Sequence, residues 1–224
     1  MHSLSRNLDR FSKTFSNEPL LESGIIEKLR SGEPVEDSEF DLIFPPYYQR
    51  QSAIHWSSID VARQISEWIR PMDRRSLIDI GCGVGKLCFL LRILTNYEVF
   101  GIEQRENFVE IANHIVDVNG FKDISIVQMN MLDLNWSLFD IYYLYNPFQE
   151  QIADDESGTI ENNIDFAVRN YARYTSEVFR QLAWAKPGKV LITFHGYGGR
   201  VPNDWKMVES RHIESGHLTM WIKE

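Results

Sequence analysis

An apolar run that ends in an acid and continues into three alternating glycines constrains this chain more than any other feature. The run reads Leu77-Ile78-Asp79-Ile80-Gly81-Cys82-Gly83-Val84-Gly85. Its apolar residues lack a helical period, which predicts a strand buried on both faces of a parallel sheet. Glycines allow a tight turn and the close approach of a ligand to the backbone. Apolar residues return at helical spacing from Leu87 to Leu94, so we expect a strand, a glycine turn and a helix whose first amides face a ligand crevice.

A second apolar strand is predicted over residues 98–103, and it ends in the carboxylate of Glu103. An acid about twenty residues after a glycine loop is well placed to accept hydrogen bonds from the ribose hydroxyls of a bound nucleoside. The plainer interpretation is a solvated acid at a strand end. Taken together with the glycine loop, the ribose role is favoured.

The spacing of the glycines separates the possible cofactors. Dinucleotide folds normally carry G-x-G-x-x-G, whereas here the third glycine follows the second after one residue. A phosphate-binding P-loop needs a glycine where Ile80 stands and Ser or Thr where Leu87 stands. The pattern therefore argues against NAD and against ATP or GTP.

Asp79-x-Gly81-x-Gly83-x-Gly85, followed by Glu103, resembles the first two motifs of the class I S-adenosylmethionine (SAM)-dependent methyltransferases. The resemblance implies a Rossmann-like fold and S-adenosyl-L-methionine as cofactor. It also implies that Asp79 positions the amino-acid end of SAM, that the glycine backbone follows the methionine portion and that Glu103 binds the ribose. The complete set of expected cofactor-binding residues is Asp79, Gly81, Cys82, Gly83, Gly85, Glu103, Gln104, Asn130 and Met131.

Asn130 and Met131 follow a third predicted strand, residues 124–128. Family members often carry Gly-Asp-Ala here, and the resemblance places Asn130 at the adenine amino group. Met131 could pack on the adenine ring. The alternative is an Asn turn followed by a core methionine.

The fourth predicted strand, residues 140–145, is aromatic and β-branched and ends in Asn146-Pro147-Phe148. Open α/β sheets bind ligands at the carboxyl ends of their strands, so Asn146 is expected to face the methyl group. The tripeptide resembles a shortened Asn-Pro-Pro-aromatic motif of methyltransferases that modify planar amines. That resemblance makes Asn146, Pro147 and Phe148 the expected catalytic residues. A proline-stiffened turn with Phe148 in the core is the alternative.

Two further resemblances say less about the acceptor. Gly83-Val84-Gly85-Lys86 with Gly101-Ile102-Glu103 is similar to the disruptor-of-telomeric-silencing class of histone-lysine methyltransferases, in the cofactor half only. That class has Asn-Asn-Phe-aliphatic where this chain has Asn-Pro-Phe. The run from His55-Trp56 to the glycine loop is similar to uncharacterised bacterial methyltransferases.

Composition adds bounds on partners. A formal net charge of −9 disfavours a nucleic-acid acceptor, since phosphate binding relies on clustered cations. The two cysteines and the scattered histidines, of which His212 and His217 flank a predicted hairpin turn, give no metal-ligand spacing, so no metal is expected. No signal core or long apolar stretch occurs, so we expect a cytoplasmic protein without a membrane segment.

The chain divides into a helical extension, residues 1–56, and a SAM-binding domain, residues 57–224. We predict helices over residues 59–69, 107–118 and 165–185, a fifth strand over 189–194, and a hairpin over 206–213 and 217–222. The expected fold is therefore α/β, a seven-stranded, mostly parallel sheet with a C-terminal antiparallel hairpin. An acidic segment over residues 148–162 is expected to be a loop beside the site.

The extension could cover the active site. Its candidates for the substrate pocket are Tyr47, Tyr48, Gln49, Arg50, His55 and Trp56. For most of them the favoured interpretation is that they anchor the extension to the core. His195 and Tyr197 follow the fifth predicted strand, and His195 is a weaker candidate for a base.

The sequence therefore predicts a SAM-dependent methyltransferase whose acceptor is an amine of a protein or a small molecule rather than nucleic acid. Two alternatives stay open: a non-catalytic SAM-binding regulatory protein and a nucleotide-cofactor oxidoreductase.

Overall fold

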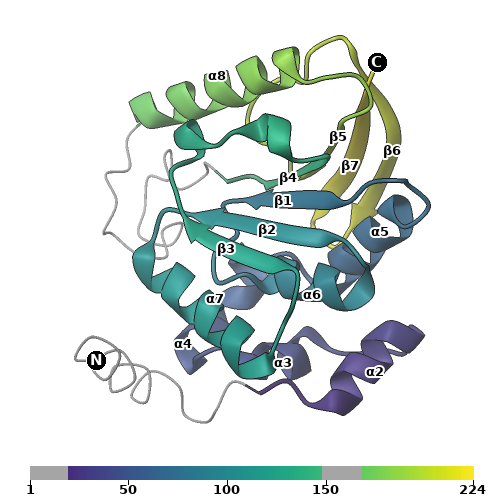
Figure 1. The fold of residues 1–224 in the computed structure, drawn as a ribbon, viewed down its shortest axis with the longest axis vertical. Helices are drawn as coiled ribbons and strands as arrows, with labels where there is room; N and C mark the ends of the chain where they lie inside the picture. The colour runs from purple at the N-terminus through teal and green to yellow at the C-terminus, as the bar shows by residue number, and fades with distance from the viewer. Residues whose placement is uncertain (1–19, 148–167) are drawn as a thin grey trace.

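The computed structural model describes residues 20–147 and 168–224, and these form a seven-stranded sheet with helices on both faces (Figure 1). The strand order is β3-β2-β1-β4-β5-β7-β6. Strands β1 to β5 run parallel, and β7 runs antiparallel to both β5 and β6. The bounds are β1 Ser76–Ile80, β2 Glu98–Glu103, β3 Ile124–Gln128, β4 Ile141–Tyr145, β5 Val190–Phe194, β6 Trp205–Ile213 and β7 Gly216–Lys223. The predicted fold class, including the terminal hairpin, is confirmed.

Helices form one layer on each side of the sheet. Three helices, α5 (Ile59–Ile69), α6 (Lys86–Leu94) and α7 (Glu106–Asn119), cover one face, and α8 (Val168–Trp184) covers the other (Figure 1). Two short 3-10 turns, η2 (Met131–Asp133) and η3 (Trp136–Leu138), precede β4, and η2 packs against α8.

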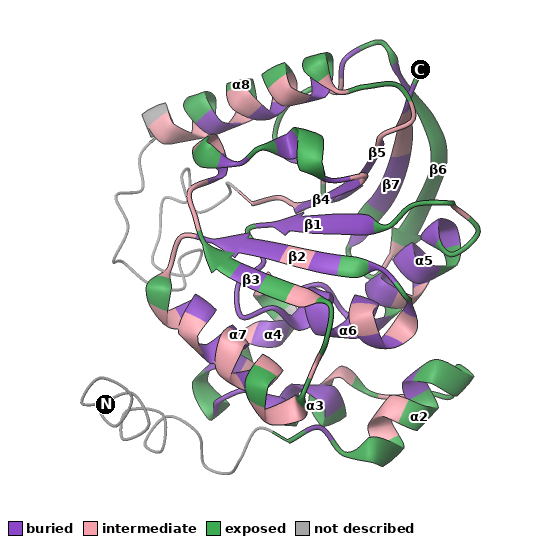
Figure 2. Cartoon of the chain, in the orientation of Figure 1, coloured by how far each residue is buried: buried purple, intermediate pink, exposed green. Residues whose placement is uncertain are grey.

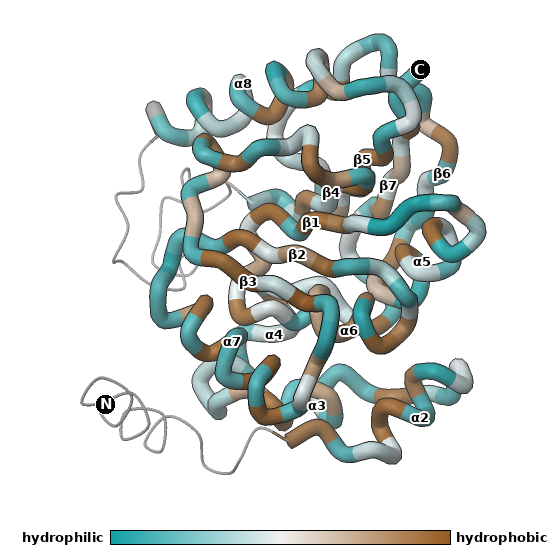
Figure 3. The backbone as a smooth tube through the Cα atoms, viewed as in Figure 1, coloured by the Kyte–Doolittle hydropathy of each residue, from teal (hydrophilic) through white to brown (hydrophobic). Residues whose placement is uncertain are grey.

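The core sits on both sides of the central strands. In β1, Leu77 belongs to the apolar cluster under α5 and α6, whereas Ile78 and Ile80 belong to the cluster under α8. Successive side chains of a strand point to opposite faces, so a strand between two helical layers needs an apolar residue at nearly every position. Figures 2 and 3 show this for the central strands, which are buried and mostly apolar. Ser76, at the start of β1, and Asp79 are the exceptions in β1.

Local signals set the helix ends. Ser58 caps α5, since its Oγ accepts a hydrogen bond of 3.3 Å from the Val61 N–H. Gly120, at φ 60°, ends α7 in the left-handed conformation that glycine tolerates best. The predicted bounds of helix 59–69 match α5. Helix 165–185 corresponds to α8, and residues 165–167 lie outside the described part.

The described part of the N-terminal region folds as short helices. These are α2 (Ser23–Ser31), α3 (Asp37–Phe40), a 3-10 turn η1 (Asp41–Ile43) and α4 (Pro46–His55). Phe44 and Pro45 separate η1 from α4, and Pro46 starts α4 because a proline fits the first turn of a helix. Figure 1 shows all of these helices on the side of the sheet that carries α5, α6 and α7.

A buried ion cluster joins this region to the glycine loop. Lys86, the residue after Gly85, is 1% exposed, and its Nζ lies 2.6 Å from Asp37 Oδ1 and 2.7 Å from Asp41 Oδ1. The same Nζ donates a hydrogen bond of 2.7 Å to Ser52 Oγ in α4. One lysine at the start of α6 thus holds α3, η1 and α4.

Candidate active site

The carboxyl ends of β1 and β4 meet where the strand order reverses, which is the usual ligand position in an open α/β sheet. Gly81 follows β1 and Asn146 follows β4. Asn146 has a positive φ of 34°, and its N–H donates to the Gly196 carbonyl at 3.0 Å. A methyl group built on Gly81 would lie 3.2 Å from Cβ of Pro147. The Asn146-Pro147 turn therefore lies directly against the glycine loop.

The three glycines of the loop are needed for conformation and for packing. Gly81, Gly83 and Gly85 have φ values of 85°, 57° and 85°, a region that side chains disfavour. A methyl group on Gly83 would lie 2.7 Å from Nε1 of Trp56, and one on Gly85 would lie 2.7 Å from Ile126 Cδ1. The missing side chains thus make room for protein neighbours, in addition to the ligand approach that the sequence pattern predicts.

Glu103, at the end of β2, reaches back to the loop. Its Oε2 accepts a hydrogen bond of 3.2 Å from the Gly83 N–H, and its Oε1 accepts 2.8 Å and 3.1 Å bonds from the Gln104 and Arg105 N–H groups. The Arg105 guanidinium also lies 3.4 Å from Oε1. These contacts fix the orientation of the carboxylate. Glu103 is 6% exposed, and within the described residues no side-chain hydroxyl group bonds to its carboxylate.

Asp79 has the opposite environment. Its side chain points into the layer of α6, where Cys88 Sγ lies 3.9 Å from Oδ2. Burial and the nearby Glu103 carboxylate raise the pKa of Asp79 to about 7. Asp79 is therefore close to half protonated at neutral pH, and a cationic group placed beside it would favour the ionised form.

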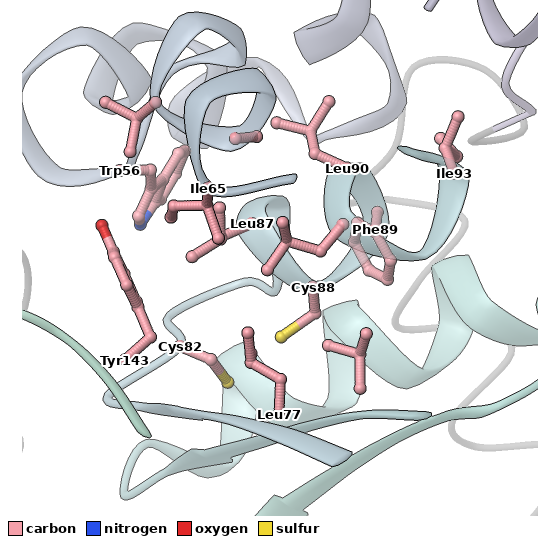
Figure 4. Packing of buried hydrophobic residues seen from close by; sticks show 14 of the residues in the cluster. Trp56, Ile65, Leu77, Cys82, Leu87, Cys88, Phe89, Leu90, Ile93 and Tyr143 are labelled. Atoms are coloured by element: carbon pink, nitrogen blue, oxygen red, sulfur yellow. The ribbon is translucent and has the colours of Figure 1, made fainter. Parts of the chain in front are cut away.

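The two cysteines lie side by side under the loop (Figure 4). Both are free and fully buried, and burial together with their mutual contact raises the pKa of the Cys82 thiol. A methyl group on Gly101 of β2 would lie 2.7 Å from Cys82 Sγ and 3.1 Å from Cys88 Sγ. Gly101 therefore provides the space that both sulfurs occupy.

Asn130 and Gln104 belong to a polar network that includes α8. Asn130 Nδ2 donates to the Tyr174 hydroxyl at 3.1 Å and to Gln104 Oε1 at 3.4 Å, and its Oδ1 accepts from the Leu132 N–H at 3.0 Å. Met131 is 3% exposed and packs in the cluster under α8. Asn130 thus caps the η2 turn as the turn interpretation expects, and Met131 occupies a core position. Their roles toward adenine stay predictions.

The end of α4 lies over the same edge of the sheet. The Trp56 indole packs on Gly83, and Tyr48 packs against both Trp56 and Phe108 of α7, with ring centroids 6.2 Å and 5.3 Å apart. The Tyr145 hydroxyl donates to the Ile54 carbonyl at 3.3 Å. Trp56 and Tyr48 are buried, as an anchoring role requires, while Tyr47 is 42% exposed.

His195 completes the edge beside β4. Its ring stacks on Tyr145 with centroids 5.7 Å apart. The backbone N–H of His195 donates a hydrogen bond to the His217 backbone carbonyl at 3.2 Å. Burial and the neighbouring His217 and His212 lower the pKa of His195, which keeps the imidazole neutral at neutral pH. The turn of the β6–β7 hairpin therefore borders the site, because β7 starts where β5 ends.

Two predictions fall outside the described residues: the position of Phe148, and the whole acidic segment over residues 148–162. Within the described ranges, no group of three His, Cys, Asp or Glu side chains is arranged to hold a metal ion. None of the described helices is both long and apolar enough to span a bilayer.

Several contacts of the site were not predicted from the sequence. Tyr174 reaches Asn130 from α8, and Arg105 reaches Glu103 from the residue before α7. Neither residue stands in a recognisable motif, and the Tyr174 contact spans 44 positions. The packing of Trp56 on Gly83 likewise needs the fold, although Trp56 was among the candidates.

Comparison with protein families matches residues 73–209 to a family described as a methyltransferase domain. The match covers more than half of the chain, and the chain belongs to this family. Membership and fold together confirm the predicted class, a SAM-dependent methyltransferase, and its cofactor, S-adenosyl-L-methionine. The site fits that group, since Glu103 offers oriented carboxylate oxygens beside the loop amides and Asp79 offers a carboxyl group that a cation would ionise.

Solved structures share the fold at low sequence identity. A methyltransferase from Geobacter sulfurreducens has a TM-score of 0.56 and 16% identity, over 90% of this chain and 98% of that one. An RNA methyltransferase from Salinibacter ruber, in complex with S-adenosyl-L-homocysteine, has a TM-score of 0.50 and 14% identity, over 74% of this chain and 89% of that one.

Two curated relatives match locally. One of them is the 23S rRNA (uracil(1939)-C(5))-methyltransferase RlmD of Marinomonas sp. (strain MWYL1), with 32% identity over 68 residues. The match spans 30% of this chain and 15% of that relative. The chain therefore corresponds to a small part of that protein's length.

Proposed function

We propose that this methyltransferase transfers the methyl group of SAM to a planar amine, and that Asn146 orients the amine. One observation carries the proposal: Pro147 packs against Gly81, so the Asn146-Pro147 turn lies at the cofactor loop. When bound, SAM supplies a methyl group that the positive sulfonium makes electrophilic. The Asn146 side-chain oxygen would accept a hydrogen of the amine and so direct the nitrogen lone pair toward the loop.

The remaining chemistry requires little of the protein. The Glu103 carboxylate would accept hydrogen bonds from the ribose hydroxyls, and Asp79 would face the amino-acid end. Trp56 and Tyr48 would exclude water from the loop, since both are buried beside it. The neutral His195 imidazole would take up the proton that the methylated amine releases.

For the acceptor, we propose an exocyclic amine of an RNA base as the first candidate. Support comes from the names of the Marinomonas relative and the Salinibacter structure, which both denote RNA methyltransferases. The net charge of −9 favours an amine of a protein or small molecule instead, and that candidate is kept as the alternative.

Carbon methylation of the kind named for the Marinomonas relative is a less suitable chemistry for this chain. A pyrimidine carbon needs prior activation by a nucleophile, for which a thiolate is well suited. Both cysteines are buried, and the pKa of each thiol is raised. Neither is therefore available as an attacking thiolate.

The test is methyl transfer from radiolabelled SAM into a cell extract, followed by separation of RNA, protein and small molecules. We expect label in a single fraction, stable to mild alkali as an N-methyl group is and a methyl ester is not. Asn146→Ala should lower the rate by about 100-fold while SAM affinity stays within twofold. Asn203→Ala, an exposed residue away from the loop, is the matched control.

Two results would contradict the proposal. Wild-type rates in Asn146→Ala would remove the orienting role. SAM binding without labelling of any fraction would favour the non-catalytic regulatory protein.

A further inference from the structure

A second cavity lies at the opposite edge of the sheet from the glycine loop. It has a volume of about 450 Å³ and is lined by four arginines, Arg30, Arg70, Arg74 and Arg92. These come from the end of α2, the residue after α5, the loop before β1 and the last turn of α6. The cavity therefore borders the amino ends of β1 and β2, and it shares no residue with the candidate active site.

The charge of this cavity is unlike that of the chain. Of the residues that the structure describes, no Asp or Glu lines it, although the chain has a net charge of −9. Among the described residues, Arg92 forms an ion pair, with Asp123 at 3.0 Å. Arg30, Arg70 and Arg74 have no carboxylate partner in that same part of the chain. Three guanidinium groups without a carboxylate partner around one cavity are a characteristic of anion sites.

Backbone carbonyls hold three of the four guanidinium groups in place. Arg74 NH2 donates to the Gly188 carbonyl at 2.7 Å, Arg92 NH1 donates to the Thr95 carbonyl at 3.1 Å, and Arg30 Nε donates to the Ile93 carbonyl at 3.4 Å. The ends of α5 and α6 favour cations nearby, which accounts for single arginines here. This helix-end effect does not account for four arginines around one cavity. Fixed guanidinium groups with remaining N–H donors suit the bidentate binding of phosphate oxygens.

The rest of the lining is apolar or neutral. Met72, Leu94 and Tyr97 form part of the wall, and the Tyr97 hydroxyl is already bonded to the Ile69 carbonyl at 2.7 Å. A volume of about 450 Å³ lies in the usual range for small-molecule sites. A ligand with a phosphate group and an apolar portion therefore matches both halves of the cavity.

We propose that this arginine-lined cavity binds the phosphate group of a ligand, either a free phosphorylated small molecule or a nucleic-acid backbone. The site is separate from methyl transfer and does not depend on the proposed acceptor.

The test measures binding to the full chain by calorimetry, with S-adenosylhomocysteine at saturation so that the cofactor crevice is occupied. The probes are pyrophosphate and a 12-nucleotide RNA without terminal phosphate. We expect Arg70→Ala to weaken binding about tenfold and Arg70→Ala/Arg74→Ala about 100-fold, with Arg70→Lys in between. Arg75→Ala is the matched control, because Arg75 is exposed, follows Arg74 in the sequence and does not line the cavity. Thermal unfolding of each variant checks that the fold is retained.

Each outcome decides the proposal. Binding of pyrophosphate that RNA does not displace supports a free phosphorylated ligand, and RNA binding that pyrophosphate displaces supports a backbone phosphate. Absence of binding by both probes, or equal weakening by Arg75→Ala and Arg70→Ala, would overturn the proposal.

Discussion

The two acids of the candidate site differ because their surroundings differ. Glu103 accepts hydrogen bonds from three backbone N–H groups, which hold its carboxylate in one orientation. Asp79 receives a thiol at 3.9 Å and is buried under α6. A carboxylate in such a place loses hydration without equivalent compensation. Glu103 is therefore suited to binding hydroxyl groups and Asp79 to responding to a cation.

Asp79 should make stability depend on pH. Its pKa is about 7 in the folded state against a usual value of 3.8. Between about pH 4 and 7 the unfolded chain loses this proton and the folded chain keeps it, so the stability from this group falls as pH rises. We expect Asp79→Asn to remove that decrease and to be more stable than wild type at pH 8. Urea unfolding at pH 5 and pH 8 measures the free energy of unfolding of wild type and of Asp79→Asn. If this free energy changed equally with pH in both proteins, the raised pKa of Asp79 would be contradicted.

Gly101 should not tolerate a side chain. A methyl group there would lie 2.7 Å from Cys82 Sγ and 3.1 Å from Cys88 Sγ, and both thiols are enclosed. Gly101→Ala should destabilise the fold by about 2 kcal/mol through overpacking. Gly24→Ala is the control, since a methyl group there meets nothing within 4 Å. Denaturant unfolding compares the two, and similar midpoints would show that the thiols can move aside.

At the scale of residues, the sequence predicts motifs better than contacts. Glu103 lies against the loop as its position after a second strand indicates, since adjacent parallel strands end at one edge. The protein neighbours of the loop glycines were not predictable, because Trp56 and Pro147 come from distant parts of the chain. Such contacts depend on the tertiary fold, and no local sequence pattern predicts them.

At the scale of elements, strands were predicted within one residue of their observed bounds where apolar runs end in polar or glycine residues, as in β2 and β3. The arrangement of the N-terminal helices was not predicted. It depends on Lys86, Asp37 and Asp41, three charged residues that a sequence interpretation places on the surface. Their burial follows from the way η1 and α4 fold over the start of α6.

Lys86 should therefore control the attachment of α3 and α4. Lys86→Met removes the cation and leaves Asp41, which is 4% exposed, without its ion pair. We expect a loss of about 3 kcal/mol in unfolding free energy, as for other broken buried pairs. Limited proteolysis should cut residues 20–56 faster. Lys122→Met, an exposed lysine, is the control, and equal cleavage of the two variants would argue against the anchor.

At the scale of the whole molecule, the proposed cofactor site would join parts of the chain that are otherwise linked through the sheet: the glycine loop, the end of β2 and the turn after β4. A ligand that binds only the folded protein stabilises all of them together. S-adenosylhomocysteine at 100 times its Kd should add about 2.7 kcal/mol and raise Tm by about 6 °C.

Glu103→Gln should reduce that Tm increase, because an amide offers one acceptor oxygen in place of two. Glu209→Gln, on the exposed strand β6, should leave it unchanged. Differential scanning calorimetry measures both variants. A full Tm increase in Glu103→Gln would show that the carboxylate does not hold the sugar.

The inward-turned lysine also bears on discrimination among adenosine compounds. In loops that bind nucleoside triphosphates, the lysine after the glycines provides a positive charge that offsets the negative charge of the phosphates. Here that charge is neutralised by Asp37 and Asp41, while the Glu103 carboxylate accepts a hydrogen bond from the loop itself. ATP would bring its negative tail toward carboxylates, whereas a sulfonium amino acid brings positive charge to the same place. We therefore expect the chain to select the methyl donor over adenine nucleotides because the Lys86 ammonium group is engaged by Asp37 and Asp41.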